Sequence, residues 1–200
     1  MRYAPYAALV VTSLLIGCNS KPSGGSGPEI ATSAALNPGA MLPKAAKLKI
    51  GEIDMPVEVQ QTVKGSEIKL DLVAHGQVFE TEGYVLDDKS FDLVDAAGEH
   101  YEPKLPLLKF PMKVGDTWSW SGEMTAGQEP HKATATVTST NDSVLLSGLG
   151  TTDTVLVVVD LSIESGGPTP ANRKLRFWLA NGKGVIKRQF GVASSREPAD

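Results

Sequence analysis

The sequence has little of the residues that build metal and disulfide sites. Its 200 residues include one cysteine and three histidines, His75, His100 and His131. A single cysteine has no partner for a disulfide within the chain. No two of the histidines stand at the close spacing of zinc ligands on one element. We therefore expect no metal site and no disulfide framework.

Motifs of catalysis and cofactor binding are also missing. There is no Gly-x-Ser-x-Gly turn of the kind that presents a nucleophilic serine, and the glycines near residues 148–150 and 182–184 do not continue into Gly-x-Gly-x-x-Gly. The carboxylates at 87–95 lack the alternation and the glycine of a calcium-binding loop. We predict no catalytic residue and no cofactor. A Ser/His/Asp triad assembled in space stays open, so a hydrolase is kept as a third alternative.

The chain has no block of lysines and arginines and no second long hydrophobic run. Its formal net charge is -4, from 19 basic and 23 acidic residues. A mildly acidic body without a basic cluster argues against nucleic acid as a partner and against electrostatic binding to anionic lipid. The body is expected to stay out of the bilayer, since no later segment has the length of a membrane span.

The N-terminus carries the most specific signal in the chain. A basic start at Arg2 leads into an apolar run over residues 6–16, which has the length of a signal-peptide core. Leu15, Ile16, Gly17 and Cys18 then resemble the lipobox of bacterial lipoproteins. That resemblance implies cleavage before Cys18 and acylation of its thiol. An ordinary secretory signal with a buried leftover cysteine is the alternative.

The composition after Cys18 divides the chain into three parts. Residues 1–17 are the signal peptide, 18–43 are a linker rich in Gly, Ser, Ala and Pro that begins at the lipidated Cys18, and 44–200 are one β-rich domain. A short helix is possible around residues 31–36. Asn19 directly after the cysteine resembles the sorting signal of lipoproteins destined for an outer membrane, in a host that has one.

From Lys44 onward apolar residues alternate with polar ones, which is the pattern of strands with one wet face. Residues 154–163 form the most hydrophobic of these strands, which should be central and covered on both sides. Asn181 with Gly182 predicts a tight hairpin turn. Prolines at 106 and 111 favour an extended crossing over the sheet, and residues 194–200 are expected to fray. The pattern predicts an all-β fold: an antiparallel meander forming a half-barrel or open barrel of roughly ten strands, with little helix apart from the signal peptide.

Two tryptophans are the candidate ligand-lining residues. If residues 125–130 form the turn between two strands, Trp118 lies opposite Val137 and Trp120 opposite Ala135. A large indole facing a small residue either packs tightly or leaves a slot for an apolar ligand. We predict that these four residues line the concave face, although buried tryptophans are more often plain core residues.

A wider resemblance is carried by residues 111–118, by Trp178 and by residues 182–187. Together they resemble a pattern in uncharacterised bacterial envelope lipoproteins, relatives of the lipoprotein-carrier half-barrels. The resemblance implies a curved antiparallel sheet around an apolar cavity. The chain departs from that pattern between residues 149 and 154. No ligand residue is carried over.

These observations favour a non-enzymatic envelope lipoprotein, anchored to a membrane through acyl chains on Cys18, that binds or shuttles an apolar small molecule or lipid. A protein-interaction or assembly module of the cell envelope is the alternative. Such a module would dock through a sheet edge or through the proline-rich crossing.

Overall fold

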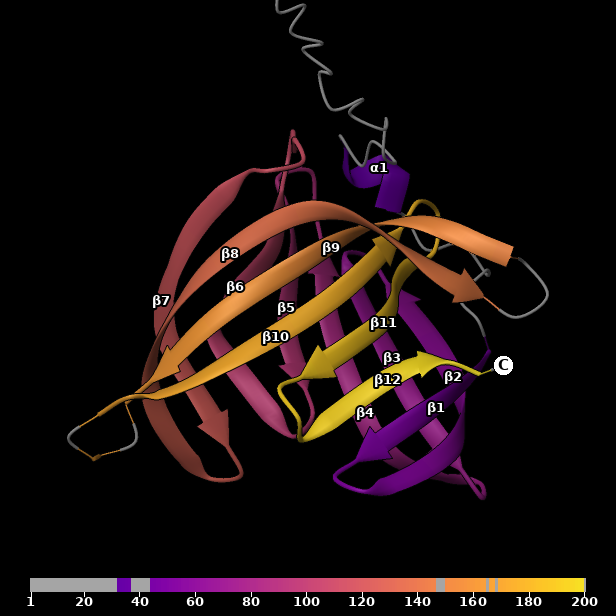
Figure 1. Cartoon of the computed structure of the whole chain (residues 1–200), viewed down its shortest axis with the longest axis horizontal. Coiled ribbons are helices and arrows are strands. Elements are labelled where there is room, and N and C mark those ends of the chain that lie inside the picture. The colour runs from indigo at the N-terminus through magenta and orange to yellow at the C-terminus, as the bar shows by residue number, and fades with distance from the viewer. Residues whose placement is uncertain (1–31, 37–43, 147–149, 165, 168, 200) are drawn as a thin grey trace, which may run out of the picture.

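The computed structural model describes residues 32–36, 44–146, 150–164, 166–167 and 169–199. Almost all of them lie in strands that form one closed antiparallel barrel (Figure 1). The elements are α1 (Ser33–Leu36), β1 (Ala45–Ile50), β2 (Ile53–Lys64), β3 (Glu67–Ala74), β4 (Gln77–Leu86), β5 (Ser90–Ala96), β6 (Glu99–Lys109), β7 (Thr117–Ala126), β8 (Glu129–Leu146), β9 (Gly150–Ile163), β10 (Ala171–Ala180), β11 (Gly184–Phe190) and β12 (Ser194–Pro198).

Each strand pairs with its neighbours in sequence, and β1 pairs with β12 to close the ring. The predicted all-β meander is therefore confirmed, but the prediction of a half-barrel or open barrel of roughly ten strands is wrong. The segment expected to fray is β12, which pairs with both β1 and β11. Its inward residues, Ser194 and Arg196, are polar and yet buried, so the usual hydrophobic signal of a closing strand is absent from the sequence.

Alternation of side chains explains the core. On β9, Val155, Val157 and Val159 are fully buried, while Asp160 between the inward positions is exposed. A strand places successive side chains on opposite faces, so one face of every strand fills the barrel. The strand pairs with β8 and β10, as every strand of a closed ring has two neighbours. The prediction that it is covered on both sides is wrong, because on its outer face Leu156 and Val158 are only half-buried and Asp160 is exposed.

The short helix α1 lies at one end of the barrel (Figure 1). Leu36 is fully buried and belongs to the hydrophobic core. The carbonyl of Ala35 accepts a hydrogen bond from the backbone N–H of Gly182, in the turn after β10. A helix was expected in this region of the predicted linker, and the structure adds that it docks on the barrel.

The proline-rich crossing is a second correction. Residues 105–109 do not cross over the sheet but continue β6, which pairs with β5 as far as Lys109. Pairing of β6 with β7 stops at Glu102, so Pro103 and Pro106 lie where β6 has no β7 ladder to join. A proline lacks the N–H that a ladder needs, and this one-sided arrangement tolerates it.

Candidate functional site

The four candidate ligand-lining residues lie where the sequence placed them relative to one another. Trp118 pairs with Val137 and Trp120 pairs with Ala135, which confirms the predicted register of β7 and β8. Trp120, Ala135 and Val137 are buried, and Trp118 is half-buried against the core. Their role in lining a ligand site stays a prediction.

Both indoles make hydrogen bonds to the backbone of β6. Trp118 Nε1 donates to the carbonyl of Pro106 at 2.8 Å, and Trp120 Nε1 donates to the carbonyl of Pro103 at 3.0 Å. The ring of Trp120 also meets Tyr101 edge to face, with 6.1 Å between centroids. Buried indoles usually need such a partner for the N–H, and here the partners are carbonyls that no β7 backbone reaches.

We call this junction the seam; it comprises residues 103–109 of β6 and residues 117–121 of β7. The two strands lie close together next to the seam, at Glu102 and Gly122, where a Cβ on Gly122 would lie 2.4 Å from the carbonyl oxygen of Glu102. Beyond that point the ladder ends. Beyond it, the indoles of Trp118 and Trp120 rather than backbone groups bridge the two strands.

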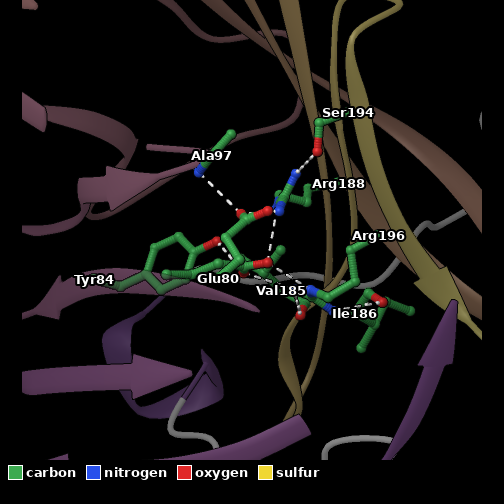
Figure 2. Close-up of polar contacts among 9 residues, drawn as sticks. Glu80, Tyr84, Ala97, Val185, Ile186, Arg188, Ser194 and Arg196 are labelled. Carbon is green, nitrogen blue, oxygen red and sulfur yellow. Dashed lines mark hydrogen bonds and ion pairs between the residues drawn. The ribbon is translucent and has the colours of Figure 1, made fainter. Parts of the chain in front are cut away.

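A cluster of charged residues fills another part of the interior. We call it the Glu82 cluster, and it consists of Glu80, Glu82, Tyr84, Arg188, Ser194 and Arg196 (Figure 2). Glu82 on β4 accepts from Nε of Arg188 on β11 and from Nε of Arg196 on β12, both at 2.7 Å. All three side chains are at most 1% exposed.

The remaining donors of the Glu82 cluster are also used. Arg196 donates to the carbonyls of Val185 and Ile186, and Arg188 donates to Ser194 and to Glu80. Glu80 accepts in turn from the backbone N–H of Ala97, in the turn between β5 and β6. Figure 2 shows these contacts converging from several strands. Burying charges is costly unless they are paired and hydrogen-bonded, and this cluster meets that condition.

The pairing shifts the ionisation of these groups. Burial by itself raises the pKa of Glu82, but attraction to Arg196 and Arg188 outweighs it and lowers the pKa to about 2. Burial and the neighbouring Glu82 carboxylate raise the pKa of Tyr84 well above its ordinary value. Glu82 is therefore ionised and Tyr84 neutral at any physiological pH, and neither is poised to exchange a proton.

A second group repeats the arrangement. In this Glu99 cluster, Tyr101 Oη donates to Glu99 Oε2 at 2.6 Å, and Arg173 on β10 forms a two-pronged ion pair with the Glu99 carboxylate on β6. Burial and the Glu99 charge raise the pKa of Tyr101. Arg173 keeps 25% of its side chain exposed. Sequence reasoning missed both clusters, although a Glu-x-Tyr pair on each of β4 and β6 was a readable signal.

The two clusters are structural: they hold strands of the barrel together, and we call them braces. Each carboxylate is saturated by guanidinium and hydroxyl donors, and each arginine links strands on different sides of the ring. Within the described residues, no three His, Cys, Asp or Glu side chains are placed to hold a metal ion. Hydrogen-bonded ion pairs of this kind fix strand positions rather than activate a nucleophile.

Of the eight large apolar side chains that are exposed in the described residues, five lie at the end of the barrel away from α1. They belong to the turns β1–β2, β3–β4 and β11–β12, which an up-and-down barrel brings to one end. We call them the apolar rim: Ile50, Ile53, Val78, Phe79 and Val192. Val192 is 96% exposed and Ile53 66%. The backbone N–H of Gly51 bonds the carbonyl of Ala193, so two of the three turns lie side by side.

Shallow depressions lie on the outer wall. One of about 410 Å³ is formed by β7, β8 and β9, and its lining includes Ser119, Ser121, Thr134 and Thr136. Another, of about 510 Å³, shares Ser121 and Thr134 with it. Both are open, hydroxyl-rich surfaces, and the lining of the first also includes Trp120 and Ala135, two of the four predicted ligand-lining residues.

Cys18 lies outside the described residues, as does the predicted signal peptide. In the part of the chain that the structure describes, no helix is long and apolar enough to cross a membrane.

Comparison with known proteins gives a structural likeness and no sequence likeness. No protein-family model matches the chain, and no curated protein sequence matches it significantly. Among solved structures it is similar to the hypothetical lipoprotein YmcC from Escherichia coli K12, with a TM-score of 0.42 and 10% sequence identity. The match covers 86% of this chain and 91% of that one. At this identity no residue role passes from one protein to the other.

Proposed function

We propose that this protein is a non-enzymatic lipoprotein of a bacterial cell envelope whose barrel serves as a protein-interaction module. Acylation of Cys18 anchors it to a membrane, which is the outer membrane in a host that has one. The apolar rim carries the proposal, because exposed apolar side chains that gather at one end of a domain mark interaction sites. The braced interior supports it, since a rigid wall holds an external surface in place.

The anchor is tested by replacing its thiol. A Cys18→Ser variant is expected to lose acylation and to leave the membrane fraction while keeping its β-type circular dichroism, because the linker separates the anchor from the barrel. Labelling with a radioactive or clickable fatty acid, followed by fractionation, measures both effects. Retention of the variant on the membrane would refute the anchor.

The interaction role is tested by crosslinking in cells. A photo-crosslinking amino acid at Ile53, in the apolar rim, should give one predominant protein adduct in stoichiometric yield. The same group at Lys174, exposed on β10 and bonded to Asp160, is the matched control. Equal labelling from the two positions would contradict a partner at the rim.

Carriage of an apolar ligand is the second candidate, and the inward position of Trp118 and Trp120 beside the seam favours it. Native mass spectrometry of protein extracted in mild detergent tests it. A bound lipid or other apolar mass in stoichiometric amount would support carriage, and a ligand-free mass would count against it.

A further inference from the structure

The seam is a strand edge in the wall of the barrel, and the ladder between neighbouring strands is also partial between β4 and β5 and between β11 and β12. β6 pairs with β5 as far as Lys109, and β7 pairs with β8 along its whole length. Toward each other, however, they pair only from Glu99 to Glu102 on β6. We call the end of this ladder, at Glu102 and Glu123, the fork. From the fork to the start of β7, the backbone N–H and C=O groups on this side of β7 have no strand beside them. Exposed edges of this kind are the usual template for pairing with another chain.

Two indole side chains of β7 use carbonyls of β6 that a neighbouring strand would otherwise bond. The carbonyls of Pro103 and Pro106 would face an adjacent strand, and each instead accepts from an indole of β7. Trp118 is only half-buried. A rotation of the indoles would release carbonyls on β6 next to the free edge of β7. Neighbouring strands lie about 4.8 Å apart, so an added strand needs about twice that spacing between its two neighbours.

Charge is distributed unevenly along the seam. Lys109 and Lys113 are exposed at its upper limit, near the loop that joins β6 to β7, and Lys104 between them and the fork pairs with Asp92. At the fork, Glu102 and Glu123 stand directly opposite each other. An extended segment with acidic residues at one end and a basic residue at the other complements this pattern.

We propose that the seam accepts an extended segment of an envelope protein by β-strand addition. Trp118 and Trp120 act as its gate, because their indoles must rotate away from the β6 carbonyls before the segment can bind. The proposal rests on the interaction role above and adds the seam to the apolar rim as a second element of the interaction. Backbone hydrogen bonds to β7 supply the affinity of the added strand, and the lysines and glutamates set its direction.

The first experiment places a photo-crosslinker in the full-length, acylated protein in cells. Ser119 is exposed on β7 at the seam, and its cross-strand partner Thr136 is exposed on β8, one strand farther from it. Crosslinked peptides from Ser119 should map to one linear segment of one protein, and Thr136 should give at least fivefold less. Equal yields, or adducts with lipid at Ser119, would overturn the proposal.

The second experiment uses that mapped segment as a synthetic peptide with the purified full-length protein in detergent. Bound peptide should slow amide hydrogen exchange in residues 117–121, and it should leave exchange in β3 unchanged. Replacing both gate indoles, Trp118→Phe with Trp120→Phe, keeps the rings but removes two donors. Peptide affinity should rise by about fivefold for each lost bond. Unchanged exchange in residues 117–121 would refute strand addition.

Charge variants keep the test decisive if the double phenylalanine variant does not fold. Lys109→Glu with Lys113→Glu should weaken peptide binding by about three- to tenfold, and Lys49→Glu, on the exposed side of β1, should not. Equal effects of the two would contradict the predicted direction. A protein adduct from Ile53 with none from Ser119 would overturn the seam alone and leave the interaction role standing. No adduct from either position would refute both.

Discussion

The Glu82 and Glu99 clusters use the same parts in different surroundings. In each, a tyrosine donates to a glutamate two residues before it, and arginine reaches that glutamate from a strand elsewhere on the ring. Glu82 holds two arginines that are at most 1% exposed, whereas Arg173 of the other cluster keeps 25% of its side chain exposed. The fully enclosed brace ties β4 to β11 and β12, where the barrel closes. We therefore expect that removing one partner destabilises the enclosed ion pair more than the exposed one.

The largest predicted difference comes from neutralising each glutamate. Glu82→Gln leaves two buried arginines without a counter-charge and should cost about 3 to 5 kcal/mol of the free energy of unfolding. Glu99→Gln should cost about 1 to 2 kcal/mol, because water reaches Arg173. Urea denaturation of the full chain in detergent measures both losses. Equal losses of unfolding free energy in the two variants would contradict the expected difference between the Glu82 and Glu99 clusters.

Acid should act mainly on the Glu82 cluster. The pKa of Glu82 falls from 4.5 in the unfolded chain to about 2 in the folded protein. Its contribution is therefore complete above pH 4.5 and is lost as pH falls from 4.5 to about 2, on the order of 3 kcal/mol in all. Unfolding free energies between pH 7 and pH 2 measure it. Glu99→Gln should keep this acid-dependent loss, and its disappearance in that variant would contradict the assignment to Glu82.

The smallest effect concerns the turn attached to the Glu82 cluster. Ala97 has a φ of 54°, in the left-handed region, and its N–H donates to Glu80. Ala97→Gly should remove about 1 to 2 kcal/mol of backbone strain and cost about 0.5 to 1 kcal/mol of chain entropy, a net gain of about 0.5 kcal/mol. Thermal unfolding detects this. Ala96→Gly, next to it in β5, should instead destabilise, and a loss in both would contradict the strain argument.

Local patterns in the sequence were sufficient to predict much of the strand pairing in the barrel wall. The pairing of Trp118 with Val137 was predicted from alternation about a turn at residues 125–130, and the structure has the same register with the turn shortened to residues 127–128. The predicted turn after β10 is present, with a positive φ at Gly182. Both depend on contacts between neighbours along the chain, and for such contacts pattern reasoning is most direct.

The closing strand and the braces could not be read in the same way. Arg188 and Arg196 look like surface residues until Glu82 is placed beside them, and they are 106 and 114 residues away from it in sequence. Alternation indicates which residues share a face, but not that a charged face points inward. β12 therefore resembled a polar tail, and the ring was predicted to stay open. The proline-rich part of β6 was misplaced because proline excludes a ladder on one side only.

The docking of α1 determines how an acylated Cys18 would present the barrel. Because Leu36 is buried in the core, the free chain between the lipid and the barrel ends at α1 and not at the boundary of the β domain. A fully extended chain over residues 19–32 measures at most about 50 Å. A pull on the anchor would therefore act on α1, at one end of the barrel. The apolar rim lies at the opposite end, so it would face the aqueous space rather than the bilayer.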